Sequence, residues 1–340
     1  MKTHAIVPVF IPHEGCPHDC VFCNQKAITA RVKSPTMEET EKLIERNLRT
    51  IEANPNIKTK EIAFYGGSFT AIPIERQTAY LEIAEKFKKT GRIDKIHMST
   101  RPDYINEEIL DNLKEHGTDV IELGVQSFDP EVLRRSARGH SAEVVFSSSE
   151  LIKSYGFELG IQLMTGLPGD TYDKCMYSVE ETVKIAPAIA RIYPAVVLKD
   201  TAMCEMYRRG EYVPWDLKTT VMTVKDMYRR LTEAGINVIR IGLKSTDVIK
   251  NEDGAVVGGY HPAFRQLVES ELAREDLEGQ LDGVSSGSAV FSANPVSFSN
   301  MIGNRGSNRK YFAEKYPDMR VRFVTDKNLP PSVYKAEVTE

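Results

Sequence analysis

Three cysteines near the start of the chain, Cys16, Cys20 and Cys23, are the residues whose type and spacing point most directly to chemistry. Intervals of three and two residues separate them, and they follow an apolar run over residues 5–12 that is typical of a β-strand. Thiolates at this spacing can bind three irons of a cubane 4Fe-4S cluster, because thiolates are its usual ligands. No fourth cysteine lies nearby in the sequence, so the fourth iron would stay open to a ligand from outside the protein.

Two simpler interpretations compete with a cluster. A zinc site would need a fourth ligand, for which His13 or His18 is placed, because structural zinc prefers four closed ligands. A disulfide fits less well, since the three cysteines are an odd set and nothing in the sequence marks a secreted chain.

Length and composition describe an ordinary globular protein. The 340 residues suggest either two domains or one barrel with an extension. The net charge of -4 argues against a protein that coats nucleic acid through its overall field, although a local basic groove is compatible with it. No apolar run is long enough for a membrane span or a signal peptide, so we expect a cytoplasmic protein without membrane contact.

Most of the chain alternates between short apolar runs and amphipathic stretches. After the first strand we expect a helix that begins with a capping box formed by Thr36 and Glu39. Five strand and helix pairs should follow, at residues 61–65 with 74–89, 95–100 with 106–116, 119–127 with 142–155, 157–167 with 172–185, and 190–198 with 219–234. Six strands that alternate with helices indicate an α/β protein with a parallel sheet, closed as a barrel or open.

Alternation along the strands predicts which side chains face inward. Residues 121, 123 and 125 are aliphatic and should pack on helices, so Glu122 and Gln126 should point to the opposite face with Gly124 between them. Gly160, Gln162 and Met164 form a similar inward set on the next strand. The predicted interior is therefore polar, and its glycines leave space there, which would suit a polar ligand.

The spacing Cys-x3-Cys-x-aromatic-Cys, with Phe22 at the aromatic position, resembles the radical S-adenosylmethionine superfamily. The resemblance implies a 4Fe-4S cluster whose open iron binds the amino and carboxylate groups of S-adenosylmethionine. It also implies reductive cleavage to a 5'-deoxyadenosyl radical, with an electron donor of the flavodoxin or ferredoxin type. Among the possible sheets, it selects a partial (β/α)6 barrel of the TIM type, followed here by a small C-terminal α+β extension.

Several strand ends resemble particular members of this superfamily. The segments that resemble the radical domain of the Elongator catalytic subunit are residues 66–70, 99–103, 122–127, 138–140 and 192–194. Residues 166–169 are similar to oxygen-independent coproporphyrinogen oxidase. The last hundred residues show no sign of the Elongator acetyltransferase domain, so acetyl-dependent chemistry is not expected.

This resemblance assigns roles to individual residues. Phe22 would pack by the adenine, and Gly66 and Gly67 would present backbone to the methionine amino group. The residues expected to reach the ribose and carboxylate are Ser99, Gln126 and Arg138, and those expected beside the adenine are Gly160, Gln162 and Met164. Lys199, placed by the prediction at the end of the sixth strand, would hold a carboxylate or phosphate. The alternatives are a surface ion pair for Arg138, a solvent-facing Lys199, and hydrogen bonds among the inward polar groups themselves.

Two cysteines and the chain end carry weaker signals. Cys175 should be a packing residue, and Cys204, near the predicted barrel mouth, is a packing residue or a hydrogen-atom donor. A glycine-rich loop over residues 302–311 with Arg305 and Arg309 can bind phosphate, and Tyr311 and Phe312 can stack on a base; a solvated helix is the alternative. His261 is either a substrate-facing group or a turn residue.

We therefore expect a radical enzyme core at residues 1–244 and a substrate-binding or capping extension at 245–340. The predicted substrate is an RNA base, such as a base of tRNA, or else a small metabolite. The competing hypothesis is a zinc-stabilised, non-catalytic RNA-binding protein.

Overall fold

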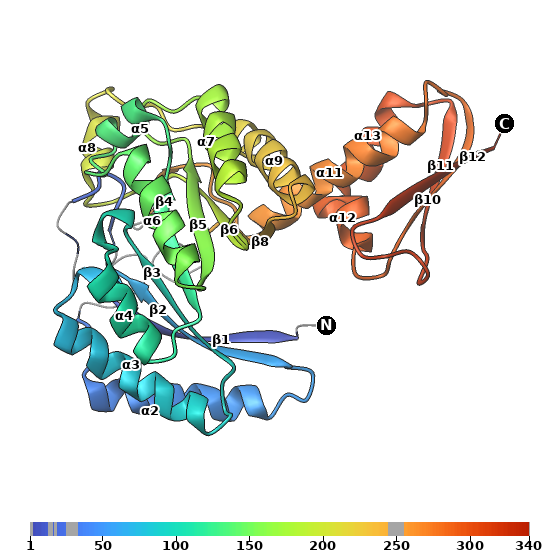
Figure 1. The fold of residues 1–340 in the computed structure, drawn as a ribbon. Helices are drawn as coiled ribbons and strands as arrows, with labels where there is room; N and C mark the ends of the chain where they lie inside the picture. The colour runs from blue at the N-terminus through green and yellow to red at the C-terminus, as the bar shows by residue number, and fades with distance from the viewer. Residues whose placement is uncertain (1–2, 13–15, 17–18, 25–32, 244–254, 340) are drawn as a thin grey trace.

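The computed structural model describes residues 3–12, 16, 19–24, 33–243 and 255–339. Its main sheet has seven parallel strands, curled into a partial barrel with helices on the outside (Figure 1). The strands follow chain order: β1 (His4–Ile11), β2 (Thr59–Gly66), β3 (Lys95–Thr100), β4 (Val120–Gln126), β5 (Glu158–Thr165), β6 (Ile189–Pro194) and β8 (Asn237–Ile241). The predicted fold class is confirmed, although the sequence analysis counted six strands and missed β8.

Amphipathic helices alternate with these strands. They are α2 (Met37–Glu52), α3 (Ile74–Lys89), α4 (Glu107–Glu115), α5 (Pro130–Arg135), α6 (Ala142–Ser154), α7 (Tyr172–Ile185), α8 (Ala202–Arg208) and α9 (Leu217–Glu233), with 3-10 turns at Phe69–Ala71 and Pro102–Tyr104. The predicted capping box is present, since the Thr36 hydroxyl accepts from the Glu39 N–H and the Glu39 carboxylate accepts from the Thr36 N–H. Most of these helices carry the connection from one parallel strand to the next, as a parallel sheet requires.

The two faces of the sheet differ in burial. In β1 the outward residues Ala5, Val7, Val9 and Ile11 are buried under helices, while each alternate residue is only partly buried. Side chains of a strand alternate between faces, so the partly buried set is the inner face of the barrel. Along β1, that face is therefore partly accessible, whereas β4 is buried on both faces.

The predicted sixth strand, residues 190–198, is in fact two strands. β6 ends at Pro194, and β7 (Val196–Leu198) leaves the main sheet to pair antiparallel with β9 (Ala255–Gly258). Proline has no N–H to continue a ladder, which explains the break. Lys199 therefore follows β7 and does not lie at the end of a barrel strand.

The rest of the chain forms a smaller unit beside the barrel (Figure 1). Its elements are α11 (Phe264–Gln280), β10 (Gly287–Ala293), α12 (Phe298–Ile302), a 3-10 turn (Asn304–Gly306), α13 (Ser307–Lys315), β11 (Met319–Thr325) and β12 (Tyr334–Thr339). The sheet order is β11-β10-β12. β12, which the sequence analysis missed, pairs antiparallel with β10.

Helix α11 belongs to both hydrophobic cores. Phe264 and Val268 pack in the barrel core, whereas Ala273 and Leu277 pack in the core of the smaller unit. The physical connection between the two parts is thus a continuous helix.

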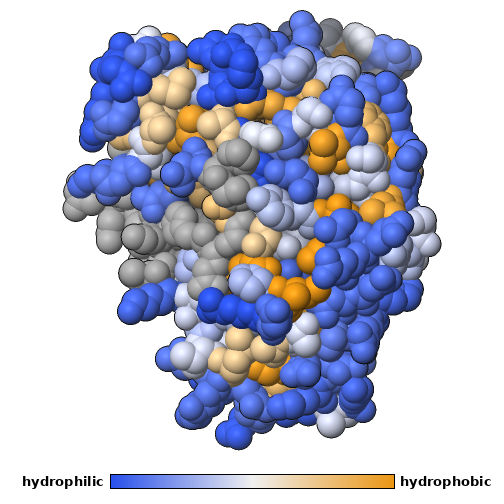
Figure 2. All heavy atoms as spheres, turned by 60° about the vertical axis from the view of Figure 1, so that its left-hand side comes forward, coloured by the Kyte–Doolittle hydropathy of each residue, from blue (hydrophilic) through white to orange (hydrophobic). Residues whose placement is uncertain are grey.

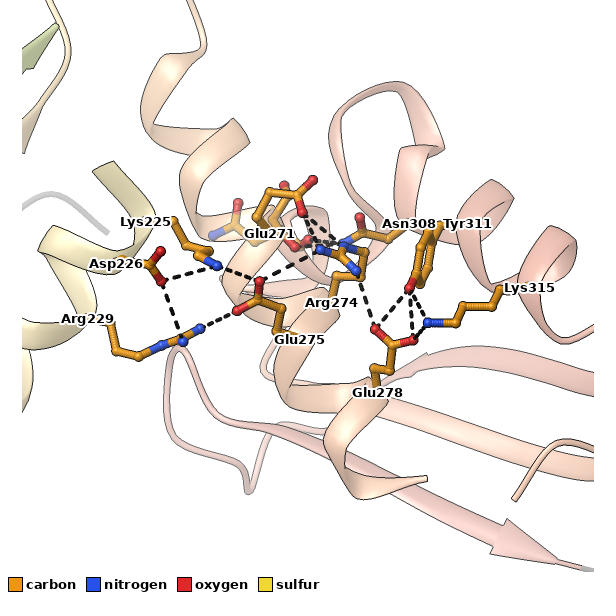
Figure 3. A network of polar contacts seen from close by, with 12 residues as sticks. Lys225, Asp226, Arg229, Glu271, Arg274, Glu275, Glu278, Asn308, Tyr311 and Lys315 are labelled. Carbon is orange, nitrogen blue, oxygen red and sulfur yellow. Dashed lines mark hydrogen bonds and ion pairs between the residues drawn. The ribbon is translucent and has the colours of Figure 1, made fainter. Parts of the chain in front are cut away.

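A set of polar contacts, which we call the junction network, reinforces this connection on α9, α11 and α13 (Figure 3). Glu275 accepts from Lys225 and Arg229, each at 2.5 Å. Farther along α11, Glu278 contacts Arg274 at 3.3 Å and accepts from the Tyr311 hydroxyl at 2.8 Å. In the junction network, carboxylates on α11 are therefore paired with basic side chains on α9, α11 and α13.

The molecular surface in Figure 2 is largely hydrophilic, with apolar side chains gathered in small patches. Within the described residues, no helix is long and apolar enough to cross a membrane.

Candidate active site

The described part of the cysteine segment is held by backbone hydrogen bonds from two directions. The Val21 N–H donates to the Ser136 carbonyl at 3.2 Å, and the Met203 N–H donates to the Val21 carbonyl at 2.8 Å. A turn brings the Cys23 N–H to within 2.9 Å of the Cys20 carbonyl oxygen. The segment is therefore tied to the region after β4 and to α8.

All three predicted ligands, Cys16, Cys20 and Cys23, are partly exposed, whereas Cys175 and Cys204 are buried. Among the described residues, no three His, Cys, Asp or Glu side chains are placed to hold a single metal ion. The predicted zinc alternatives with His13 and His18 lie outside the described residues.

Phe22 packs against an apolar cluster beside the cysteine segment. The buried members of the cluster are Val132, Leu167, Ala195, Val197, Met203, Cys204 and Tyr212, and Met164 packs against it together with Val21 and Phe22. Two residues predicted to flank the adenine, Phe22 and Met164, thus contact the same cluster. Cys204 is fully buried in it, which favours the predicted packing role.

Arg138 connects the cysteine segment to the end of β4. Its Nη1 donates to the Cys20 sulfur at 3.2 Å, and its Nη2 donates to the Gly124 carbonyl. Arg101 in turn donates to the Arg138 carbonyl at 2.5 Å. A guanidinium beside a sulfur suits a thiolate cluster ligand, because hydrogen bonds to the sulfurs tune such clusters.

Three buried polar atoms near Arg138 have no hydrogen-bond partner among the described residues: Gln126 Oε1, Arg138 Nε and His140 Nε2. Such atoms are rare in native proteins and call for an explanation, for example a ligand. Burial and the neighbouring Arg138 charge lower the pKa of His140 to about 4, so its imidazole is neutral at pH 7. This set of donors and acceptors fits a zwitterionic ligand such as S-adenosylmethionine.

Gln126 reaches this place by an unexpected backbone path. A register shift interrupts β4 between Gly124 and Gln126, and Gln126 has a φ of 73°. A Cβ on Gly124 would lie 3.2 Å from Gln126 Nε2 and 3.6 Å from Arg138 Nη2. Simple alternation predicted the inward face correctly for Glu122, but Gln126 depends on this bulge and on the glycine before it.

Gly66 and Gly67 lie where β2 meets the end of β1. Gly66 has a φ of 119°, and a Cβ there would be 2.6 Å from the Ile11 carbonyl oxygen. The Gly67 N–H donates to the same oxygen at 2.8 Å. Close packing on β1 therefore requires a glycine at 66, and a methionine amino group, which needs acceptors, would have to use carbonyl oxygens here.

Ser99 and Gln162 are engaged with Glu122 on the inner face. Gln162 Nε2 donates to Ser99 Oγ at 3.1 Å and also to Glu122, and the Ser99 hydroxyl donates to Glu122 at 3.3 Å. Gly160 makes room for this carboxylate, since a Cβ on Gly160 would lie 3.0 Å from Glu122 Cγ. The hydrogen bonds among inward polar groups that the sequence analysis held as an alternative are thus present for Ser99 and Gln162.

Glu122 is the centre of what we call the inner-face network, whose other members are Glu61, Tyr65, His97, Ser99, Gln162 and Arg191. Arg191 Nε donates to Glu122 at 2.7 Å, and His97 lies 3.5 Å from both Glu122 and Glu61. Burial alone would raise the pKa of Glu122, but Arg191 and His97 outweigh it and lower that pKa to about 2. Sequence reasoning missed His97 and Arg191, although both lie at inward positions of predicted strands.

The last predicted residue, Lys199, is exposed, and its backbone carbonyl accepts from Asn24 Nδ2 at 3.0 Å. Farther along the chain, His261 makes a local turn in which its Nδ1 accepts from the Ala263 N–H at 3.1 Å. Phe312 is fully buried in the core of the smaller unit, so the predicted base stacking by Phe312 is wrong.

Comparison with known proteins identifies the family. The model of the radical SAM superfamily matches residues 10–182, and that of the radical SAM C-terminal domain matches residues 187–274. The chain belongs to the radical SAM superfamily. The protein is therefore an enzyme of this superfamily, and membership implies that it uses a 4Fe-4S cluster and S-adenosylmethionine.

Among radical SAM relatives, the chain is 29% identical over 253 residues to the tRNA uridine(34) acetyltransferase of Methanocaldococcus jannaschii, covering 62% of this chain and 46% of that protein. It is 24% identical over 256 residues to Elongator complex protein 3 of Dictyostelium discoideum, with coverages of 61% and 46%. The chain thus spans less than half the length of these relatives.

The fold is also similar to that of N-terminally truncated archaeal Elp3 from Methanocaldococcus infernus. The TM-score is 0.63 at 21% identity, covering 81% of this chain and 64% of that one.

Proposed function

We propose that this enzyme binds a 4Fe-4S cluster through Cys16, Cys20 and Cys23 and abstracts hydrogen from a tRNA base. When bound, the cluster would reduce S-adenosylmethionine to methionine and a 5'-deoxyadenosyl radical, the species that abstracts the hydrogen. The observation that carries the proposal is the contact of Arg138 with the Cys20 sulfur, beside three buried polar atoms without partners.

The chain's own residues would bind and orient the cofactor. The Arg138 Nε is placed to hold a carboxylate, because a guanidinium binds carboxylates through charged hydrogen bonds. Gln126 Oε1 can accept from a ribose hydroxyl or an amino group, and the partly exposed Ser99 and Gln162 border the same inner face. Gly66 and Gly67 would offer carbonyl oxygens to the methionine amino group.

Packing would hold the adenosine part of the cofactor. Phe22 and Met164 would supply an apolar surface for the adenine, and Gly160 would lie on the strand that flanks it. Lys199 is exposed near Asn24 and would interact with an anionic part of the substrate rather than with the cofactor.

The tRNA substrate is supported by the names of the relatives. Because the chain spans less than half their length, we do not extend their acetyl transfer to it. We propose residues 1–244 as the catalytic core and 245–340 as the part that binds substrate or caps the barrel. A cytoplasmic enzyme with a flavodoxin or ferredoxin as reductant completes the proposal.

A small metabolite is the second candidate substrate, and the partly exposed inner face is compatible with it. Superfamily membership disfavours the third hypothesis, a zinc-stabilised, non-catalytic RNA-binding protein.

The proposal is tested by incubating the anaerobically reconstituted enzyme with dithionite and S-adenosylmethionine. We expect wild type to release 5'-deoxyadenosine and Cys23→Ala to release only background. Cys175→Ala is the matched control, because this buried cysteine lies outside the proposed cluster site. Equal release from wild type and Cys23→Ala would refute the proposed chemistry.

The substrate is tested separately by comparing modified tRNA nucleosides between a deletion strain and its parent. The loss of one modified nucleoside, restored by wild type but not by Cys23→Ala, would support the tRNA assignment. An unchanged nucleoside profile with an altered metabolite profile would favour the small-molecule substrate.

A further inference from the structure

The inner face carries a second set of groups that the proposed cofactor contacts do not use. Phe10, Tyr65, Tyr193 and Arg240 are the next-to-last residues of β1, β2, β6 and β8, and each is partly exposed. In parallel barrels the carboxyl ends of the strands hold the chemistry. These four residues therefore lie at the functional end, on the first two and the last two strands of the sheet.

The side chain of Arg191, on β6, connects this strand to β2. Its Nη2 donates to the Tyr65 hydroxyl at 2.6 Å, and its Nη1 donates to the Tyr193 hydroxyl at 3.3 Å. The guanidinium also lies over the Tyr65 ring, with 5.0 Å between Cζ and the ring centroid. Because Arg191 is bound to Glu122, its charge is already compensated inside the protein.

Arg240 is the uncompensated charge of this region. It pairs with Arg191 across the β6–β8 ladder, and the following residue, Ile241, packs in the outer core, so Arg240 points to the inner face. Among the described residues its side chain forms no hydrogen bond or ion pair, and its charge acts on the neighbouring Tyr193. By contrast, the nearby Arg265 is paired with Glu269 at 2.7 Å.

Two adjacent guanidiniums repel each other, since like charges on neighbouring strands are destabilising. One carboxylate, Glu122, faces this pair, while Glu61 is occupied by His4 at 3.1 Å and by His97 at 3.5 Å. Burial raises the pKa of Tyr193, so its phenol stays neutral and supplies no negative charge. Arg191, Arg240 and Glu122 together therefore carry one net positive charge.

We propose that Arg240, together with Tyr193, forms the substrate subsite, where Arg240 binds an oxyanion of phosphate or carboxylate type and the tyrosine ring contacts a planar group. The inference rests on the proposed function, because it takes the barrel interior as the place where substrate meets cofactor. Beyond the proposed function, the inference specifies the chemical class of the bound substrate group, an oxyanion, and the residue that selects it, Arg240.

The test measures binding to the reconstituted enzyme in the presence of S-adenosylmethionine, by anaerobic calorimetry, with uridine 5'-monophosphate, uridine and acetate as probes. We expect wild type to bind the monophosphate at least about tenfold more tightly than uridine, as a charged hydrogen bond would give. Arg240→Gln should abolish this preference, and Arg240→Lys should retain part of it. Arg46→Gln, the same change on the exposed face of α2, should leave it unchanged.

The probes also distinguish the source of the anion. Preference for the monophosphate supports a nucleotide phosphate, whereas acetate binding that is lost in Arg240→Gln supports a carboxylate. The inference would be overturned if wild type showed no preference for an anion, or if Arg240→Gln kept the wild-type preference.

Release of 5'-deoxyadenosine by the same wild-type preparation separates the two proposals. If the nucleoside is released without anion preference, only the subsite is wrong. If none is released, the proposed function fails, while the anion measurement still decides the subsite.

Discussion

Two charged networks in this enzyme look alike in composition but differ in completeness. In the junction network, carboxylates on α11 are matched by Lys225, Arg229, Arg274 and Lys315 across helix surfaces (Figure 3). The inner-face network is more deeply buried, yet the buried Arg138 Nε and Gln126 Oε1 near it have no hydrogen-bond partner in the described part of the chain. A saturated network stabilises the packing of two parts, whereas unsatisfied groups at the end of a barrel mark a surface built for a ligand.

The largest effect is expected where the unsatisfied groups meet the cysteines. Cys20→Ala should reduce the iron content from about four per chain to nearly none, because the remaining thiolates cannot hold the cubane. Iron and sulfide analysis after anaerobic purification measures this. Cys175→Ala should keep its iron, and a Cys20→Ala protein with full iron content would contradict the assignment.

The second largest effect concerns how much each network contributes to the free energy of unfolding. Glu122→Gln should lower the free energy of unfolding by about 3–5 kcal/mol, because Arg191 would be left buried without a counter-charge. Glu275→Gln in the junction network should cost about 1 kcal/mol, since the carboxylate there is partly exposed. Urea unfolding of both variants gives the comparison, and equal losses would show that burial does not distinguish the networks.

A smaller effect should appear in the pH dependence of stability. Burial lowers the pKa of His97, but Glu122 and Glu61 outweigh it, so the pKa is raised above 6.5. The stability contributed by protonated His97 is therefore complete below pH 6.5 and is lost as the pH rises through the raised value. The other basic side chains beside this group of carboxylates are His4, 3.1 Å from Glu61, and Arg191.

Urea unfolding at several values between about pH 6 and pH 9 tests this dependence. Wild type should lose stability over that range, by less than the loss caused by Glu122→Gln. The curve of His97→Gln should be flatter, and parallel curves for the two proteins would exclude His97 as the titrating group.

The smallest effect concerns the smaller unit and RNA. Arg305 and Arg309 are exposed and form no ion pair within the described part of the chain. Arg305→Glu with Arg309→Glu should weaken tRNA binding and reduce its salt dependence by about one unit of slope for each lost phosphate contact. The matched control is Arg46→Glu with Arg49→Glu on α2, and equal weakening by both pairs would indicate only a general charge effect.

Local patterns were sufficient for much of the architecture. Alternation of apolar runs and amphipathic stretches predicted the parallel α/β sheet, and Thr36 with Glu39 predicted a helix start that the structure contains. The errors occurred at short elements. β8 and β12 have weak local signals because their hydrophobic faces are completed only by neighbouring strands, and β7 separated from β6 at a proline.

The candidate site was predictable only in part. Glu122 follows from alternation along one strand, but its partner Arg191 is 69 residues away and is found only when the sheet curls. Gln126 shows the limit of alternation, because a bulge changed its backbone path.

By itself, the sequence determined the order of strands and helices, the cysteine spacing and the polar character of the inner face, because these depend on local periodicity and residue type. Only the tertiary structure decided which inward groups neutralise one another and which remain without partners. That distinction depends on distances between strands far apart in the chain, which local periodicity does not specify.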